Sequence, residues 1–254
     1  MKFLRKFSLI HWLLIATFFK EIVFSLTTPL WHGPDEQAHF AQVQYYAEYK
    51  RQFPNDAALN TTSQEVLLTE RLLGTERDDF GKNLFTHNPA FRLEYTDTTA
   101  GKYEQIIESL PQASRTTLVK KEATVYPPLF YILSAFFYFL VYPLSLIDRV
   151  FMTRLASIGM GVATIWLTYK IARLVFPKRE LFAVTAATLV SFQPMFSFLT
   201  ASVNSDNGMN LLFTWFLYLA VKTINERKLS LKSMISFIIV YVAGFLTKPH
   251  FVIA

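Results

Sequence analysis

Cysteine is absent from this chain, and charged residues make up only 17% of its 254 positions. The missing cysteines exclude disulfides, thiolate metal sites and a cysteine nucleophile. The chain also lacks a Walker phosphate loop, a dinucleotide-binding glycine fingerprint and a His-Glu-x-x-His zinc motif. Because a typical soluble domain is about 25% charged, the low charge content argues against a single soluble domain.

Long apolar runs take the place of the missing charge. Hydrophobic residues make up 52% of the chain, and the mean hydropathy is +0.27. Six segments approach the roughly 20 apolar residues that a membrane-spanning helix needs. They are Phe7–Leu30, Pro127–Ile147, Val150–Tyr169, Leu181–Ser202, Gly208–Val221 and Ser233–Ala254. The first run is too long for a signal peptide. The last run continues to the end of the sequence, which predicts that this chain is the N-terminal part of a longer membrane protein.

A polar segment, Trp31–Val125, separates the first two apolar runs. It is too long for a simple connection, so we expect it to contain structure of its own. Helical spacing of apolar residues predicts one helix over Asp35–Lys50 and a second over Ser63–Leu73, whereas residues 74–125 show no clear period.

The expected fold is all-α, a polytopic membrane helical bundle with a long outer loop that contains juxtamembrane helices. Residues 1–30 are expected to form the first transmembrane helix. Residues 31–149 are expected to form an extracytoplasmic loop, with juxtamembrane helices at about 35–51 and 127–147. Residues 150–254 are expected to form the further transmembrane helices.

Lysine and arginine are concentrated in short flanks of the apolar runs. Met1–Lys6 contains three, and Lys170–Glu180 and Lys222–Lys232 contain four each. Such flanks stay in the cytoplasm, whereas a loop as long as Trp31–Val125 has little influence on orientation. The net charge of +6 is therefore interpreted as a membrane topology signal and not as a nucleic-acid-binding patch.

These basic flanks conflict with a chain in which all six runs cross from a cytoplasmic N-terminus, because two flanks would then lie outside. Either the N-terminus is outside, or one run does not cross. We prefer the second solution, with Pro127–Ile147 as the exception. Its prolines and tyrosines are typical of a segment that lies at the headgroup interface. The extracytoplasmic face is then shared by the long loop, Asp148-Arg149, Ser202–Asn207 and Lys248–His250.

The most suggestive polar motif follows the first apolar run and reads Trp31-His32-Gly33-Pro34-Asp35-Glu36-Gln37-Ala38-His39-Phe40. It places two carboxylates at the start of a helix, where backbone N–H groups and the helix dipole stabilise an anion. Asp35 and His39 are four residues apart and share a helix face. The pattern favours an ionised general base, although an ordinary acidic helix start with a solvated histidine also fits it.

Further polar residues interrupt the later runs near the same face, and they are Arg149, Arg154, Asp206, Lys248 and His250. An arginine in an apolar run either serves a function or pairs with another charge, unless it extends to the headgroups. Asp206 is either a functional carboxylate or a helix N-cap. Pro249 beside Lys248 leaves backbone polar groups without helical hydrogen bonds. This indicates either a cavity lined by the protein or a kinked helix.

Short motifs follow one another in a defined order along the chain. They are Pro34-Asp35-Glu36 with His39-Phe40, Tyr126-Pro127-Pro128-Leu129-Phe130-Tyr131, Arg154-Leu155, Phe176-Pro177-Lys178-Arg179, Gln193-Pro194, Ser202-Val203-Asn204-Ser205-Asp206 and Leu246-Thr247-Lys248-Pro249. In this order they resemble the integral-membrane C-type glycosyltransferase superfamily, and most closely its protein-mannosyltransferase and aminoarabinose-transferase-like branch. The resemblance covers nearly the whole chain except about residues 55–120. Tyr126 departs from the aminoarabinose branch, which has a lysine before the juxtamembrane proline.

The resemblance implies an enzyme that moves a sugar from a polyprenyl-phosphate donor to an acceptor hydroxyl on the extracytoplasmic face. Asp35 falls on the family's essential aspartate and is the expected catalytic base, with Glu36 as a second catalytic candidate. The expected substrate-binding residues are His39, Tyr126, Arg149, Arg154, Asp206, Lys248 and His250. No cofactor is required, although Asp35 and Asp206 are candidate ligands for a divalent metal.

The partners implied are the lipid-linked donor, the bilayer and an acceptor glycan, lipid or protein, with no nucleic acid. The expected location is the cell or inner membrane, with a cytoplasmic N-terminus. Two other classes of protein remain open at this point. A secondary transporter also contains broken spans and intramembrane charges. A non-catalytic scaffold or receptor would use the long loop to bind a partner.

Overall fold

The computed structural model describes residues 8–50, 61–76, 97–121 and 126–253, with side chains omitted at 97–100 and 253. Its fold is helical. The elements are α1 (Leu9–Thr27), α2 (Glu36–Tyr49), β1 (Thr61–Ser63), α3 (Gln64–Leu72), α4 (Asp97–Glu108), η4 (Gln112–Arg115), β2 (Leu118–Lys120), α5 (Leu129–Leu140), α6 (Leu146–Val175), α7 (Glu180–Ser191), α8 (Pro194–Thr200), α9 (Asp206–Glu226), α10 (Leu231–Phe245) and η5 (Pro249–Ile253).

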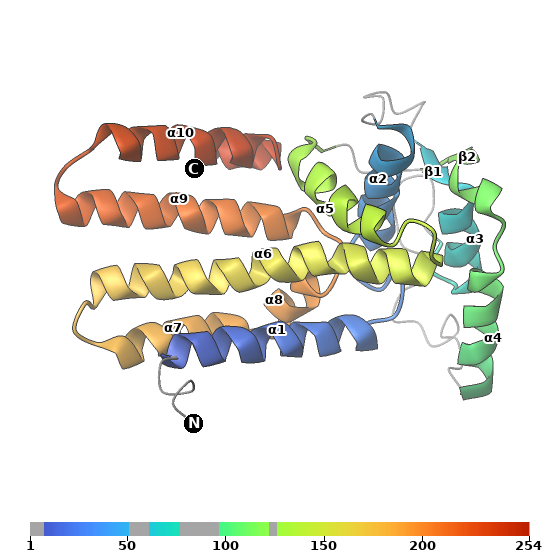
Figure 1. The fold of residues 1–254 in the computed structure, drawn as a ribbon, viewed down its shortest axis with the longest axis horizontal. Helices are drawn as coiled ribbons and strands as arrows, with labels where there is room; N and C mark the ends of the chain where they lie inside the picture. The colour runs from blue at the N-terminus through green and yellow to red at the C-terminus, as the bar shows by residue number, and fades with distance from the viewer. Residues whose placement is uncertain (1–7, 51–60, 77–96, 122–125, 254) are drawn as a thin grey trace.

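The long helices α1, α6, α9 and α10 run side by side along the long axis of the molecule (Figure 1). Helix α6 is central and contacts α1, α7 and α9. Helices α2 to α5 and the two strands gather at one end of this bundle (Figure 1). We call this end the polar end. The loops α6–α7 and α9–α10 lie at the opposite end (Figure 1).

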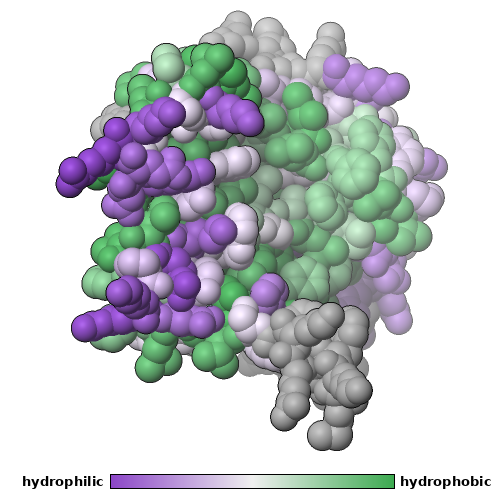
Figure 2. Space-filling view, turned by 60° about the vertical axis from the view of Figure 1, so that its left-hand side comes forward, coloured by the Kyte–Doolittle hydropathy of each residue, from purple (hydrophilic) through white to green (hydrophobic). Residues whose placement is uncertain are grey.

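Two helices, α1 and α6, are long and apolar enough to cross a membrane by length and composition. Helices α7 and α8 together pass the same test as one span bent by 65°. Apolar side chains on the outer surface of α1 are exposed, for example Phe19 at 59% and Leu26 at 66%. Figure 2 shows hydrophilic side chains gathered on the end that carries the two loops, with hydrophobic surface along the side behind it. This distribution is that of a helical membrane protein.

The break between α7 and α8 is stabilised by a charge pair on α1. Pro194 begins α8, and the break leaves the carbonyl of Ser191 without a helical partner. The Lys20 ammonium donates to that carbonyl and to Ser197 Oγ, and it pairs with Glu21 at 2.8 Å. A broken helix needs such partners inside a bilayer because water cannot satisfy its backbone there.

Helix α5 does not cross the bundle. Its 12 residues span about 18 Å, well short of the ~30 Å hydrocarbon core. Its first N–H, from Leu129, donates to the Leu246 carbonyl at the end of α10, and its last residues lead directly into α6 at the polar end. The position of Pro127–Ile147 at the membrane interface stays a prediction, and the structure shows a helix in this segment that is too short to span. Helix α5 also brings the flanks Lys170–Glu180 and Lys222–Lys232 to the same end of the bundle, while Met1–Lys6 lies outside the described residues.

The segment between α1 and α5 is more structured than its sequence indicates. The predicted helices over Asp35–Lys50 and Ser63–Leu73 are present as α2 and α3. Helix α4 and the antiparallel pair β1–β2, which aligns Thr61 with Lys120, lie where no periodic pattern was visible. The core of this region is built from buried aromatic side chains on α2 and α5, and they include Phe40, Phe130, Tyr131 and Tyr138.

Candidate functional site

The turn after α1 holds two residues in the left-handed backbone region. Trp31 has a φ of 63° and Asp35 has a φ of 55°, which is uncommon for residues other than glycine. Trp31 is buried, and its indole N–H donates to Thr69 Oγ1 at 3.0 Å. Backbone of this kind costs energy, persists only where its surroundings fix it and occurs most often at functional sites. The packing of Trp31 thus fixes the turn that presents Asp35.

Asp35 occupies the N-cap position of α2. Its side chain is exposed, and it does not make the usual capping hydrogen bond to the first turn of the helix. The first backbone N–H groups of α2 lie beside it. The structure therefore leaves the Asp35 side chain accessible to solvent.

Glu36, the neighbouring carboxylate, is fully buried against Arg154. Each carboxylate oxygen accepts a hydrogen bond from the guanidinium at 2.7 Å, and Oε1 also accepts the Val203 backbone N–H at 3.0 Å. The other donors of Arg154 bind three backbone carbonyls at the end of α1, those of Ser25, Thr28 and Pro29. All five guanidinium N–H groups are therefore in use. This geometry argues against the predicted catalytic role of Glu36 and against phosphate binding by Arg154.

Arg149, another predicted substrate-binding residue, is also buried, at 1% exposed. Its two terminal nitrogens donate to the Glu65 carboxylate at 2.8 Å each, and Nη1 also donates to the Tyr138 hydroxyl at 2.6 Å. Its Nε donates to backbone carbonyls just before α6. Arg149 therefore joins α6 to α3 and α5, and it does not face a substrate in this structure.

The turn before α9 is tied to the turn before α2 through Asn204. Its side-chain amide donates to the Pro34 carbonyl at 2.9 Å, and its side-chain oxygen accepts the Asp206 backbone N–H at 2.8 Å. The two turns also touch at Gly33, where a Cβ would lie 2.4 Å from the Cβ of Ser202. Only glycine fits such a close approach. One side chain therefore links the segments that carry Asp35 and Asp206.

Asp206 and Lys248 form an ion pair at the polar end. Asp206 is 39% exposed, and Lys248 lies over the ring of Tyr126 at 4.9 Å. His39 stacks between Tyr126 and Tyr131, with centroids 6.0 Å away in each case, and its Nδ1 lies 2.9 Å from the Tyr131 hydroxyl. We call these five residues the Asp206–Lys248 cluster. It unites four of the predicted substrate-binding residues with Tyr131.

Burial of the tyrosines near this cluster suppresses their ionisation. Desolvation raises the pKa of Tyr46 to about 12 and raises the pKa of Tyr131 well above its ordinary value. Tyr46 stacks on Tyr131, with ring centroids 6.3 Å apart. Both hydroxyls therefore stay protonated at neutral pH, and the Tyr131 hydroxyl is the one that lies within hydrogen-bond distance of His39.

The predicted metal and His250 sites have less support in the geometry. His250 is exposed on η5, two residues after Lys248, and no hydrogen bond joins it to the cluster among the described contacts. Across the parts of the chain that the structure describes, no group of three or more histidine, aspartate or glutamate side chains is placed to hold a metal ion. Asp206, one of the two candidate ligands, already pairs with Lys248.

Sequence reasoning quoted Asn204 and Tyr131 inside motifs but gave them no role. Each became recognisable only through a partner distant in the sequence, Pro34 for Asn204 and His39 for Tyr131. An asparagine in a polar turn and a tyrosine three residues after a proline are weak signals on their own. Their contribution depends on tertiary contacts.

The comparison with known families gives a match over residues 18–253 to the family described as a predicted membrane protein (DUF2142). The chain belongs to the DUF2142 family. The match includes α2, α5 and every residue of the Asp206–Lys248 cluster. No curated protein and no solved structure matches this DUF2142 chain. The description of DUF2142 supports a membrane protein and gives no activity, so the resemblance to glycosyltransferases stays a prediction.

Proposed function

We propose that this DUF2142 chain carries the catalytic part of a membrane glycosyltransferase that uses a polyprenyl-phosphate sugar. The observation that carries the proposal is an exposed carboxylate, Asp35, on a turn that Asn204 links to the Asp206–Lys248 ion pair. A base and a cation at one end of the bundle suit a transfer reaction that removes a proton and releases a phosphate. The ordered motifs supply the class of donor.

The reaction needs two groups at opposite sides of the sugar. The acceptor hydroxyl attacks the anomeric carbon, and its proton passes to the Asp35 carboxylate. The bond between the anomeric carbon and the phosphate oxygen breaks, and its electron pair leaves with the polyprenyl phosphate. Attack from the face opposite the phosphate inverts the anomeric centre. A cation beside the phosphate stabilises the charge that develops there.

Lys248 is the cation that best suits the phosphate. An ammonium has three N–H donors, and the described contacts of Lys248 use one of them, on Asp206. Arg154, in contrast, has spent all five donors on Glu36 and backbone carbonyls. We therefore assign phosphate binding to Lys248, with His250 on the same segment as a second contact, and give Asp206 the task of orienting the ammonium.

The buried ion pairs hold this arrangement in place. Glu36 and Arg154 join the ends of α1 and α2 to α6. The Val203 N–H donates to Glu36, which also joins the turn before α9 to this pair. Arg149 and Glu65 join α6 to α3. Glu36, Arg149 and Arg154 are positioning residues in this proposal. The Tyr126 ring contacts the Lys248 ammonium through a cation–π interaction.

The polar end faces away from the cytosol in this proposal. The two basic flanks lie at the opposite end of the bundle, and positively charged loops stay in the cytoplasm. The exposed apolar side chains of α5, such as Phe136 and Phe139, then rest against the outer leaflet. The lipid-linked donor reaches Lys248 from that leaflet.

The direct test is transfer by the full-length protein from a defined polyprenyl-phosphate sugar, with product analysis by mass spectrometry. Asp35→Asn removes the base and keeps the shape of the side chain. We expect it to lower turnover by at least ~10²-fold without loss of folded protein. Glu108→Gln, an exposed carboxylate on α4 outside the cluster, is the control and should keep normal turnover. Near-normal transfer by Asp35→Asn would remove Asp35 from the base role.

A secondary transporter is favoured by one observation, the broken span α7–α8 with the intramembrane pair Lys20–Glu21 beside it. Lys20 is already used to satisfy the backbone at that break, which gives the pair a structural task. Reconstituted vesicles distinguish the two functions. Uptake of a water-soluble solute that depends on Glu21 would support the transporter, and sugar transfer that depends on Asp35 supports the enzyme.

A further inference from the structure

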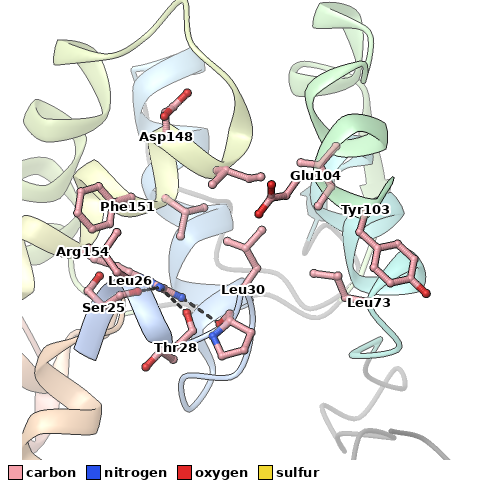
Figure 3. Close-up of a pocket in the computed structure, with 14 residues that line it drawn as sticks. Ser25, Leu26, Thr28, Leu30, Leu73, Tyr103, Glu104, Asp148, Phe151 and Arg154 are labelled. Carbon is pink, nitrogen blue, oxygen red and sulfur yellow. Dashed lines mark hydrogen bonds between the residues drawn. The ribbon is translucent and has the colours of Figure 1, made fainter. Parts of the chain in front are cut away.

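A cavity of about 310 Å³ lies between the end of α1, the start of α6 and helix α4 (Figure 3). Most of its lining is apolar and includes Leu30, Leu73, Ile107 and Phe151. Leu26 also lines it and is 66% exposed, so the cavity opens at the surface of α1. The cavity therefore sits where a spanning helix leaves the bilayer, which is a position that a lipid chain can enter.

The rim of this cavity is acidic. Glu104 extends from α4 toward the cavity, and Asp148 lies above it at the start of α6 (Figure 3). Both side chains are on exposed residues. Arg154 is the basic residue of the lining, and its charge is already neutralised by the buried carboxylate of Glu36. The rim thus repels an anionic headgroup such as a polyprenyl phosphate and attracts a cationic one.

One polar atom inside the cavity has no partner. Ser25 is 1% exposed, lines the cavity, and its hydroxyl makes no hydrogen bond. A buried hydroxyl without a partner costs free energy, so such a group indicates a missing ligand or water. It lies on α1 less than one turn before the helix ends at Thr27, close to the end of a helix that is long and apolar enough to span a membrane.

We infer that this cavity binds an aminophospholipid from the surrounding bilayer. One acyl chain fills the apolar lining, an ester carbonyl accepts a hydrogen bond from Ser25, and the ammonium headgroup lies between Glu104 and Asp148. Charge complementarity selects the headgroup. The cavity is lined by two carboxylates, and its basic residue, Arg154, is already paired with Glu36. The site is separate from the proposed donor site at Lys248, and the inference does not depend on glycosyl transfer.

The test uses the full-length protein in nanodiscs that contain equal amounts of phosphatidylethanolamine and phosphatidylglycerol with identical chains. Lipid that stays bound after transfer to detergent is identified by native mass spectrometry. We expect about fivefold enrichment of phosphatidylethanolamine, which corresponds to roughly 1 kcal/mol from partly exposed ion pairs. Glu104→Lys should reduce the enrichment below about twofold. Ile147→Trp, which fills the cavity, should abolish the retention of both lipids.

Glu108→Lys is the matched control, since it makes the same charge change one turn further along α4 and outside the cavity. It should keep the wild-type enrichment. Equal retention of the two lipids by the wild-type protein would overturn the inference, and so would an enrichment that falls as much in Glu108→Lys as in Glu104→Lys. Failure here leaves the Asp35 experiment unaffected, because that experiment measures transfer.

Discussion

At the scale of single residues, Lys248 differs from the two arginines in how many of its side-chain N–H groups are already used in hydrogen bonds. Arg149 and Arg154 are buried and bound to carboxylates, so their charges serve the fold. Lys248 keeps donors available at the polar end beside an Asp206 that is 39% exposed. The sequence could indicate all three as unusual charges in apolar runs, but it could not show how many N–H donors of each were already bound.

Replacement of Lys248 tests its assignment to the phosphate. Lys248→Gln should raise the KM for the polyprenyl-phosphate sugar roughly 10- to 100-fold, because a charge-assisted hydrogen bond contributes about 1.5–3 kcal/mol. Lys248→Arg should restore part of the affinity. Lys222→Gln, at the opposite end of the bundle, is the control. An unchanged KM for the donor in Lys248→Gln would contradict the assignment.

At the scale of elements, the sequence predicts those helices that carry their own boundary signals. Helix α2 lies between Pro34 and the turn at Lys50, and α3 begins at a serine cap, Ser63, whose side chain accepts the Val66 N–H. The strands β1 and β2 could not be predicted, because each has three residues and the partner lies more than 50 residues away. Pairing of Glu36 with Arg154 was hidden for the same reason, since 118 residues separate the two.

The Glu36–Arg154 pair joins α1, α2, α6 and the turn before α9, so its removal should destabilise the whole arrangement. Arg154→Met leaves the Glu36 charge and three backbone carbonyls without their partner, and the loss of one member of a buried pair costs about 3–5 kcal/mol. We expect a fall of roughly 10 °C in the melting temperature of the detergent-solubilised protein. Arg154→Lys should not rescue it, because a single ammonium cannot form the planar fork.

Arg179→Met, which removes an exposed arginine from the α6–α7 loop, is the control and should leave the melting temperature within a few degrees of wild type. Wild-type stability in Arg154→Lys would show that the fork geometry contributes little. In that case the positive charge at residue 154, and not the planar geometry of the guanidinium, would stabilise the fold.

At the scale of the whole molecule, the Asp206–Lys248 cluster and the two basic flanks lie at opposite ends of the bundle. The acidic and aromatic groups of the Asp206–Lys248 cluster lie at the polar end, and the basic flanks of α7 and α10 lie at the other. Helix α5 makes this separation feasible, because it returns to the polar end without crossing. The central claim of the proposed function concerns this arrangement: we propose that the polar end lies on the extracytoplasmic side, where a lipid-linked sugar would meet its acceptor.

The measurement that tests this claim most directly is cysteine accessibility in intact cells. The 254 residues contain no cysteine, so His250→Cys at the polar end and Lys228→Cys in the α9–α10 loop each introduce one cysteine into this part of the protein, and any cysteine outside it is replaced by serine. A membrane-impermeant maleimide should label His250→Cys in intact cells and Lys228→Cys only after the cells are permeabilised. Labelling of Lys228→Cys alone in intact cells, or equal labelling of both, would contradict the account.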